Sequence, residues 1–267
     1  MVERLKSAIE RAREKRNVSQ TLEAAAPPAA SADWRAAPEV GLDPATLAAG
    51  RVVALERRDP ANVPFDILRT RILKLLRDEK IARIGVTSPS KGCGKTVVAA
   101  NLALSLARQR DHKAILLDMD LRAPRLASTL GLRARASMRA FLTGETDIAD
   151  CLSRVGENLL LFVNETVEHD AAELMHSREA ARVLADMRRR YAPDILIYDL
   201  PPLPTSDDVI GFTPNLDGAL LVAAAGATLP SEIQDCERQL SGAAPLMGVI
   251  LNKVEGDAEG VYQTDYA

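Results

Sequence analysis

The chain has 267 residues, of which 47% are hydrophobic and 27% charged, values that are ordinary for a globular protein able to bury a full core. A formal net charge of −3 and only 3% aromatic residues exclude a dominant basic field and a base-stacking surface, so we expect no nucleic-acid partner. Three widely spaced cysteines fit neither a disulfide framework nor a zinc site, and the longest charge-free apolar run, residues 218–227, is too short to span a bilayer. We therefore expect a cytoplasmic location.

Residues 1–17 have the pattern of an amphipathic helix. Apolar side chains recur about one turn apart among six basic and three acidic residues. The apolar face is thin and lacks aromatic residues, so docking to a partner is favoured over insertion into a membrane. A solvated helical arm remains the alternative interpretation.

Residues 18–50 are predicted to be a flexible linker. Eleven alanines and four prolines make up 15 of the 29 residues from 22 to 50, so the segment can bury too little surface to offset its ordering entropy. Trp34 is the one docking point in it. The globular domain is expected to span residues 51–254, with its first helix over 64–76.

The rest of the domain alternates short apolar runs with longer helical patterns. The runs predict strands at residues 82–87, 113–118, 158–163, 194–199, 218–223 and 247–251. Continuous apolar strands separated by helices are typical of a parallel sheet that is covered on both faces. The sequence therefore predicts one α/β domain.

A phosphate-binding loop follows the first of these strands. Residues 88–96 read Ser-Pro-Ser-Lys-Gly-Cys-Gly-Lys-Thr between a strand and a helix, which is the context of a P-loop, although the strict Walker pattern has glycine where Pro89 stands. The glycines let backbone amides face a polyphosphate, the lysine supplies charge, and the threonine hydroxyl can ligate Mg²⁺. The residues expected to bind the nucleotide here are Gly92, Cys93, Gly94, Lys95, Thr96 and Val97.

Three aspartates end neighbouring strands or follow them. Asp118 and Asp120 come at the end of the second strand and Asp199 at the end of the fourth. In an open parallel sheet such positions converge on the ligand crevice, and three acids there are costly unless a nucleotide-bound Mg²⁺ relieves their repulsion. Each piece alone could be a tight turn or a helix cap. Together they predict an ATP or GTP site in a P-loop NTPase sandwich of three layers, with helices on both faces of a mainly parallel sheet.

The chain at this point resembles the bacterial tyrosine kinases, or BY-kinases, of capsule and exopolysaccharide synthesis, in their stand-alone cytoplasmic form. The resemblance covers about residues 55–254. Its motifs lie at residues 88–96, 99–103, 118–124, 130–132, 173–177, 199–202 and 248–253.

The resemblance implies a set of roles. Asp118 would be the base toward an incoming tyrosine hydroxyl, with Lys95 and Asp120 also catalytic. Mg²⁺ would be held by Thr96, Asp120 and Asp199, and Asn252 would lie near the nucleotide base. Because valine rather than aspartate follows the Asn-Lys pair at 252–253, ATP is favoured over GTP.

The expected phosphoacceptor is the acidic tail at residues 255–267, which carries Tyr262 and Tyr266. It lacks apolar periodicity, so it could reach the site of a neighbouring copy. Family tails carry more tyrosines than this one, so an ordinary disordered end is the alternative. Tyr191 and Tyr198 are predicted to be core or strand residues.

The resemblance also implies partners. We expect self-association for phosphorylation in trans, a transmembrane activator that regulates chain length in polysaccharide export, and other protein substrates. Such a partner would bring the cytoplasmic protein to the inner face of the plasma membrane. The family's Glu-x-x-Arg-x-x-Arg assembly pattern is reduced here to Arg69, with Val63 and Asp66 at the other two positions, which puts self-association through that helix in doubt.

Two other functions remain open. Partition and division-site ATPases share the fold but carry a signature lysine where this chain has Ser90, with Lys91 one residue off. A nucleotide-dependent scaffold for polysaccharide export, without kinase activity, is the third hypothesis. Arg122 is expected either to contact phosphate or tail, or to pair with an aspartate.

Overall fold

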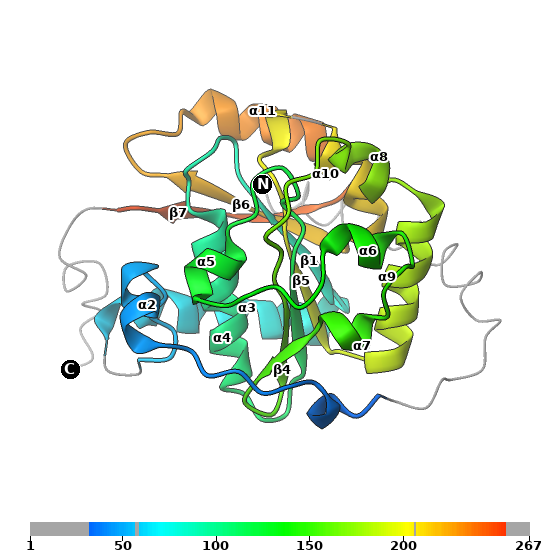
Figure 1. Ribbon diagram of the computed structural model, residues 1–267. Coiled ribbons are helices and arrows are strands. Elements are labelled where there is room, and N and C mark those ends of the chain that lie inside the picture. The colour runs from blue at the N-terminus through cyan, green and yellow to red at the C-terminus, as the bar shows by residue number, and fades with distance from the viewer. Residues whose placement is uncertain (1–31, 57–58, 206, 255–267) are drawn as a thin grey trace.

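The computed structural model describes residues 32–56, 59–205 and 207–254 (Figure 1). The helix expected at residues 1–17, the linker residues 18–31, and the tail at 255–267 with both candidate phosphoacceptors lie outside the described residues.

A seven-stranded sheet with the order β3-β4-β2-β5-β1-β6-β7 forms the centre of the domain. The strands are β1 (Arg83–Thr87), β2 (Ala114–Asp118), β3 (Ser153–Val155), β4 (Leu159–Phe162), β5 (Ile195–Asp199), β6 (Gly218–Ala224) and β7 (Leu246–Asn252). Neighbours are parallel except for β3, which pairs antiparallel with β4. The six predicted strands are confirmed to within one residue at each end; β3 was missed because three residues centred on Arg154 give no apolar run.

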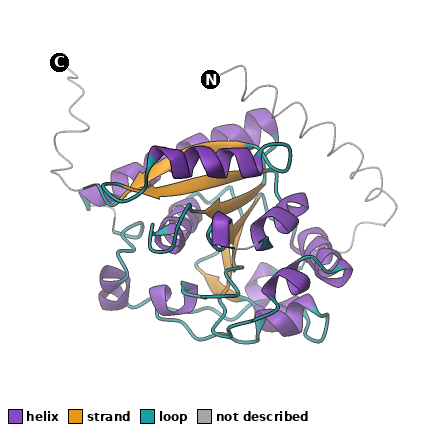
Figure 2. Ribbon diagram, turned by 90° about the horizontal axis from the view of Figure 1, so that it is seen from above, coloured by secondary structure: helices purple, strands orange, loops and turns teal. Residues whose placement is uncertain are grey.

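Helices cover both faces of the sheet (Figure 2). Successive residues of β2 point to opposite faces, so Ile115 and Leu117 join one buried cluster while Ala114 and Leu116 join the other. Buried residues of α2 (Pro44–Ala49), α3 (Val63–Glu79), α4 (Lys95–Ala107) and α5 (Leu126–Leu130) belong to the second cluster. Those of α6 (Met138–Leu142), α7 (Ile148–Cys151), α8 (Ala171–Met175), α9 (Arg178–Tyr191), α10 (Asp208–Phe212) and α11 (Pro230–Leu240) belong to the first. Short 3₁₀ turns lie at Trp34–Ala36, Pro60–Asn62, Leu203–Thr205 and Thr213–Asn215. The three-layer α/β prediction is confirmed.

The chain order places a ligand crevice beside β1. From β1 the chain passes through α4 to β2 on one side, and from β5 it passes to β6 on the other side of β1. Where connections leave neighbouring strands in opposite directions, α/β sheets bind ligands at the carboxyl ends of those strands. The P-loop and the aspartates therefore share one edge of the sheet.

The prediction of a flexible linker is wrong for residues 32–50. Trp34 is 4% exposed and its indole N–H donates to the Tyr191 carbonyl at 2.9 Å. Leu47 on α2 is equally well buried. Composition indicated too little apolar surface, but Trp34, Ala37 and Leu47 are buried against the domain, and backbone hydrogen bonds join the segment to Arg154.

The predicted first helix is confirmed as α3. The guanidinium of Arg69 does not face outward for assembly; it binds Asp66 at 2.6 Å and the Ser105 hydroxyl of α4 at 3.0 Å. Tyr191 and Tyr198 are buried, as predicted. Within the described part of the chain, no helix is both long and apolar enough to cross a bilayer.

Candidate active site

The loop between β1 and α4 has the backbone that its glycines predict. Gly92 and Gly94 have φ of 82° and 94°, in the left-handed region that disfavours side chains. A Cβ on Gly94 would also lie 2.2 Å from Nδ2 of Asn252, so a side chain there would collide as well as strain the backbone. Lys95 and Thr96 begin α4 and are buried, as a phosphate-binding loop requires.

The three predicted aspartates come together around Lys95. Asp118 and Asp199 are direct partners in the register of β2 and β5. The Lys95 ammonium lies 2.7 Å from Oδ2 of Asp120 and 3.7 Å from Oδ1 of Asp199. Since Asp118 and Asp199 are 0% exposed and Asp120 is 4% exposed, the carboxylates have almost no solvation by water. One lysine thus neutralises part of a buried cluster of three acids.

Burial and neighbouring charges shift the pKa values of Asp118, Asp199 and Lys95. Burial first, and then the charge of Asp199, raise the pKa of Asp118 well above its usual value. Burial raises the pKa of Asp199 to about 6 in spite of the Lys95 ammonium. Burial opposes the charged form of Lys95, but Asp199 and Asp120 outweigh it and raise the pKa of the lysine. The cluster therefore holds more negative charge than its own residues can stabilise.

Several carboxylate oxygens in the cluster have no hydrogen-bond partner. Oδ2 of Asp118 accepts the Leu126 backbone N–H at 3.0 Å, whereas Oδ1 of Asp118 and both oxygens of Asp199 accept none among the described residues. Orphaned buried carboxylate oxygens fit a hard divalent cation. The described residues hold no ready-made group of three metal-ligating side chains, and Mg²⁺ in phosphoryl-transfer sites uses one or two carboxylates with phosphates and waters. The residues present thus fit a nucleotide-bound Mg²⁺.

Asn252 lies at the end of β7, where its side chain donates to the Cys93 carbonyl at 2.9 Å. The sequence-based prediction had Asn252 near the nucleotide base. It did not include this contact, because no sequence signal links residues 159 positions apart. Cys93 is itself buried, with its thiol next to the hydroxyls of Ser90 and Thr228. Burial raises the pKa of this thiol, but these hydrogen bonds outweigh it and lower the pKa. Hydrogen bonds with Asn252 of β7 and with Thr228 in the turn after β6 therefore fix the position of the loop.

Of the two expectations for Arg122, pairing with an aspartate is confirmed. Its guanidinium binds both oxygens of Asp208, at 2.6 and 3.0 Å, and Asp208 is 0% exposed. The ring of His176 contacts the Asp208 carbonyl at 3.3 Å. Sequence reasoning missed this joint between the loop after β2 and α10, because Asp208 lies 86 residues from Arg122.

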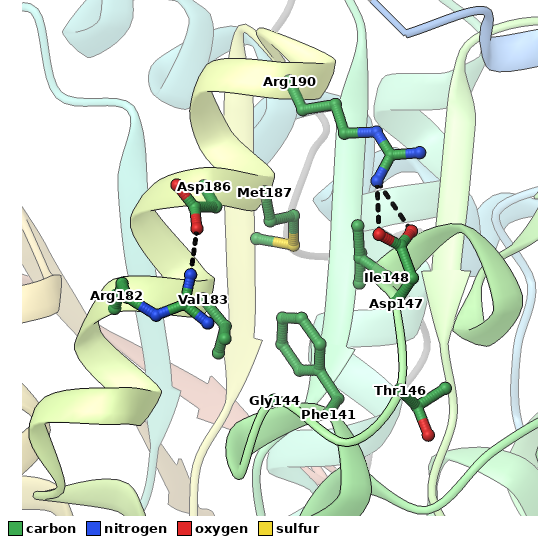
Figure 3. A pocket seen from close by; sticks show the side chains of 10 residues that line it. All are labelled: Phe141, Gly144, Thr146, Asp147, Ile148, Arg182, Val183, Asp186, Met187 and Arg190. Carbon is green, nitrogen blue, oxygen red and sulfur yellow. Dashed lines mark hydrogen bonds and ion pairs between the residues drawn. The ribbon is translucent and has the colours of Figure 1, made fainter. Parts of the chain in front are cut away.

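A cavity of about 210 Å³ lies away from these residues, between α6, α7 and α9 (Figure 3). Its charged groups pair with one another, Arg190 with Asp147 and Arg182 with Asp186 (Figure 3). None of the predicted site residues that the structure describes lines it. The nucleotide site is assigned by the P-loop and the aspartates rather than by this hollow.

Comparisons with known proteins also indicate a nucleotide-binding domain. The family model described as CobQ/CobB/MinD/ParA nucleotide binding domain matches residues 84–266, more than half of the chain. The tyrosine-protein kinase CpsD of Streptococcus pneumoniae serotype 4 is 30% identical over 183 residues, which cover 67% of this chain and 79% of that protein.

Solved structures of tyrosine kinase domains have the same fold as this chain. The kinase domain of VpsO superposes with a TM-score of 0.63 and 25% identity, covering 72% of this chain and 96% of that domain. The kinase domain of the Escherichia coli tyrosine kinase ETK, at 23% identity, shares the fold with a TM-score of 0.70 over 80% of this chain and 84% of its own. The resemblance drawn from the motifs is confirmed, and the chain belongs to the bacterial tyrosine kinase family within the CobQ/CobB/MinD/ParA class of nucleotide-binding domains.

Proposed function

We propose that this chain is an ATP-dependent protein-tyrosine kinase of capsular or exopolysaccharide synthesis that phosphorylates Tyr262 and Tyr266 of a neighbouring copy. The observation that carries the proposal is the buried cluster of Lys95, Asp118 and Asp199 directly beside the P-loop, with carboxylate oxygens left without partners. Membership of the tyrosine kinase family supports the choice of tyrosine as acceptor. The serine at position 90 supports it against a partition ATPase.

The P-loop residues would hold the phosphates. Backbone amides of residues 92–97 would donate to the polyphosphate at the start of α4, where the helix dipole also favours negative charge. The Lys95 ammonium, which lies 2.7 Å from Asp120 at the start of α4, would bind the outer phosphates.

Thr96, Asp120 and Asp199 would hold Mg²⁺. When bound, Mg²⁺ neutralises the charge that develops on the phosphate oxygens. Asp199 would also balance the charge of Lys95, whose ammonium lies 3.7 Å from Oδ1 of Asp199.

Asp118 would receive the proton. As the tyrosine oxygen bonds to the γ-phosphorus, the bond from that phosphorus to the β–γ bridging oxygen breaks and the hydroxyl proton passes to Asp118. Oδ1 of Asp118 lacks a partner, and burial raises the pKa of this carboxyl, which makes it a stronger base than an exposed aspartate. Such positioning and charge neutralisation are the main demands of phosphoryl transfer.

The test is mass spectrometry of the C-terminal peptide after incubation with Mg·ATP, with and without the candidate membrane activator. Phosphate on Tyr262 or Tyr266 that is absent in Lys95→Met is the expected result. Mixing Lys95→Met, as acceptor, with Tyr262→Phe/Tyr266→Phe, as donor, separates the two directions of transfer: phosphate on the Lys95→Met chain demonstrates transfer in trans. ATP turnover with an unmodified tail, even with the activator, would refute the proposal.

A further inference from the structure

Residues 32–54, which we call the strap, run across the domain from α9 to α4 (Figure 1). At the first end, the Ala32 backbone N–H donates to the Arg190 carbonyl at 2.7 Å, and Trp34 packs edge-on against the Tyr191 ring. The strap next exchanges two backbone hydrogen bonds with Arg154 of β3, at 2.8 and 2.9 Å. These contacts anchor it at the edge of the sheet.

The middle of the strap packs closely against α5. Gly50, the residue that ends α2, lies so close to this helix that a Cβ there would be 2.7 Å from the Thr129 carbonyl oxygen. At the other end of the contact, a Cβ on Gly131 would be 2.8 Å from a methyl group of Thr46. Leu47 is buried in the same cluster as Leu126 and Leu130 of α5. The strap and α5 are therefore closely packed, with no room for an added methyl group at Gly50 or Gly131.

The last part of the strap is clamped to α4 by Asn101. The Asn101 side-chain oxygen accepts the backbone N–H groups of Val53 and Ala54 at 2.8 and 2.9 Å. Its amide nitrogen donates to the carbonyls of Arg51 and Val97 at 3.1 and 2.9 Å. All four hydrogen-bonding positions of a fully buried amide are used, so this end of the strap is fixed in register.

The beginning of α5 in turn holds Asp118. The backbone N–H of Leu126, the first residue of α5, donates to Oδ2 of Asp118 at 3.0 Å. Since α5 has only five residues, a displacement at Thr129 reaches Leu126 within one turn. The longer α4, of 13 residues, is buried along most of its length.

We propose that the strap positions Asp118 through α5, so that a change in the packing of the strap on α5 alters the rate of phosphoryl transfer rather than the affinity for ATP. The inference rests on the role proposed above for Asp118. It makes Gly50 a positioning residue that acts through Thr129 and Leu126.

The full-length chain carrying Gly50→Ala tests this directly. The backbone at Gly50, with φ −77°, accepts alanine without strain, so the new methyl group acts through its contact with the Thr129 carbonyl. Gly41→Ala is the matched control, because no atom lies within 4 Å of a Cβ at this other strap glycine. Emission from Trp34, the single tryptophan, reports whether the strap stays docked in both variants.

Hydrogen exchange at Leu126, together with kcat and KM, distinguishes a positioning effect on Asp118 from a general loss of folding. For Gly50→Ala we expect faster hydrogen exchange at the Leu126 amide and a kcat for tail phosphorylation lower by roughly tenfold, with KM for ATP within twofold of the wild type. Gly41→Ala should match the wild type in all three measurements. Should Gly50→Ala fold poorly, Thr46→Ser, which removes the methyl group facing Gly131, gives a second variant with the same expected direction.

Unchanged exchange at Leu126, unchanged kcat, or equal losses in kcat and ATP affinity would each overturn the proposal. If the wild type itself transfers no phosphate to tyrosine, the proposed function fails, whereas the exchange at Leu126 still decides whether the strap acts on α5.

Discussion

Replacing Asp199 with asparagine should stabilise the nucleotide-free protein at neutral pH while removing activity. Asp199 is 0% exposed, faces Asp118 across the β2–β5 pair, and has its pKa raised by burial to about 6 from a usual 3.8. At pH 7.5 the carboxylate is ionised in both the folded and unfolded chains, so the folded state carries the cost of the raised pKa. About two pKa units at 1.36 kcal/mol each amount to about 3 kcal/mol, which neutral asparagine should recover.

The sign of the pH dependence follows from the same shift. Below pH 3.8 Asp199 is protonated in both states and contributes no penalty; between there and about pH 6 the folded state binds the extra proton, so stability falls as pH rises. The penalty is complete above about pH 6. Asp118 acts in the same direction because its pKa is also raised, by burial and by Asp199.

Urea unfolding and thermal unfolding of the metal-free protein, each followed by circular dichroism at pH 7.5 and pH 5, measure the effect. Asp199→Asn should have the higher free energy of unfolding at pH 7.5, with a Tm higher by roughly 6–12 °C, and a smaller difference from the wild type at pH 5. Asp217→Asn is the matched control: burial opposes its charge, but Arg83 and two backbone N–H groups lower the pKa of Asp217, so that variant should lose stability. An Asp199→Asn protein no more stable than the wild type at pH 7.5 would refute the electrostatic reasoning.

Three further predictions concern the P-loop, the strap and the Arg122 joint. Gly94→Ala should weaken binding of a fluorescent ATP analogue by at least about tenfold, because the residue has φ 94° and faces Asn252, whereas Gly248→Ala, with no atom within 4 Å of its Cβ, should bind normally. Trp34→Ala should lower the free energy of unfolding by about 3 kcal/mol, through loss of its packing on Tyr191 and its hydrogen bond; a loss under about 1 kcal/mol in urea denaturation would contradict the packing of the strap. Asp208→Asn should cost about 2 kcal/mol, since it breaks a two-point ion pair with Arg122, and thermal unfolding at neutral pH with no change would count against that pair.

Local patterns were enough to predict much of the fold and the core of the site. Strands β2, β5 and β6 are short and continuously apolar because they are buried on both faces, so their ends could be predicted to one residue. The loop glycines and Lys95 form a contiguous motif whose backbone demands are local. The acids at 118 and 199 follow from their places at strand ends, since parallel strands align those ends.

Other parts of the site depend on contacts between distant residues, which no local pattern encodes. The Asn252 side chain donates to the P-loop only because β7 lies beside β6. Asp208 meets Arg122 only because the fold brings together two segments that are 86 residues apart. The strap was misread for a related reason: its composition is that of a linker, and Trp34 and Leu47 become buried only against surfaces made by α9 and α5.

The sequence by itself determined the three-layer α/β fold, the P-loop and the three aspartates, because hydrophobic periodicity and contiguous motifs act over a few residues. Only the tertiary structure decided that Lys95 lies beside carboxylate oxygens of Asp199 that accept no hydrogen bond, that Asn252 donates to the loop and that the strap contacts α5. Burial, and the pKa shifts that it causes, depend on which surfaces of the folded chain exclude water from these groups.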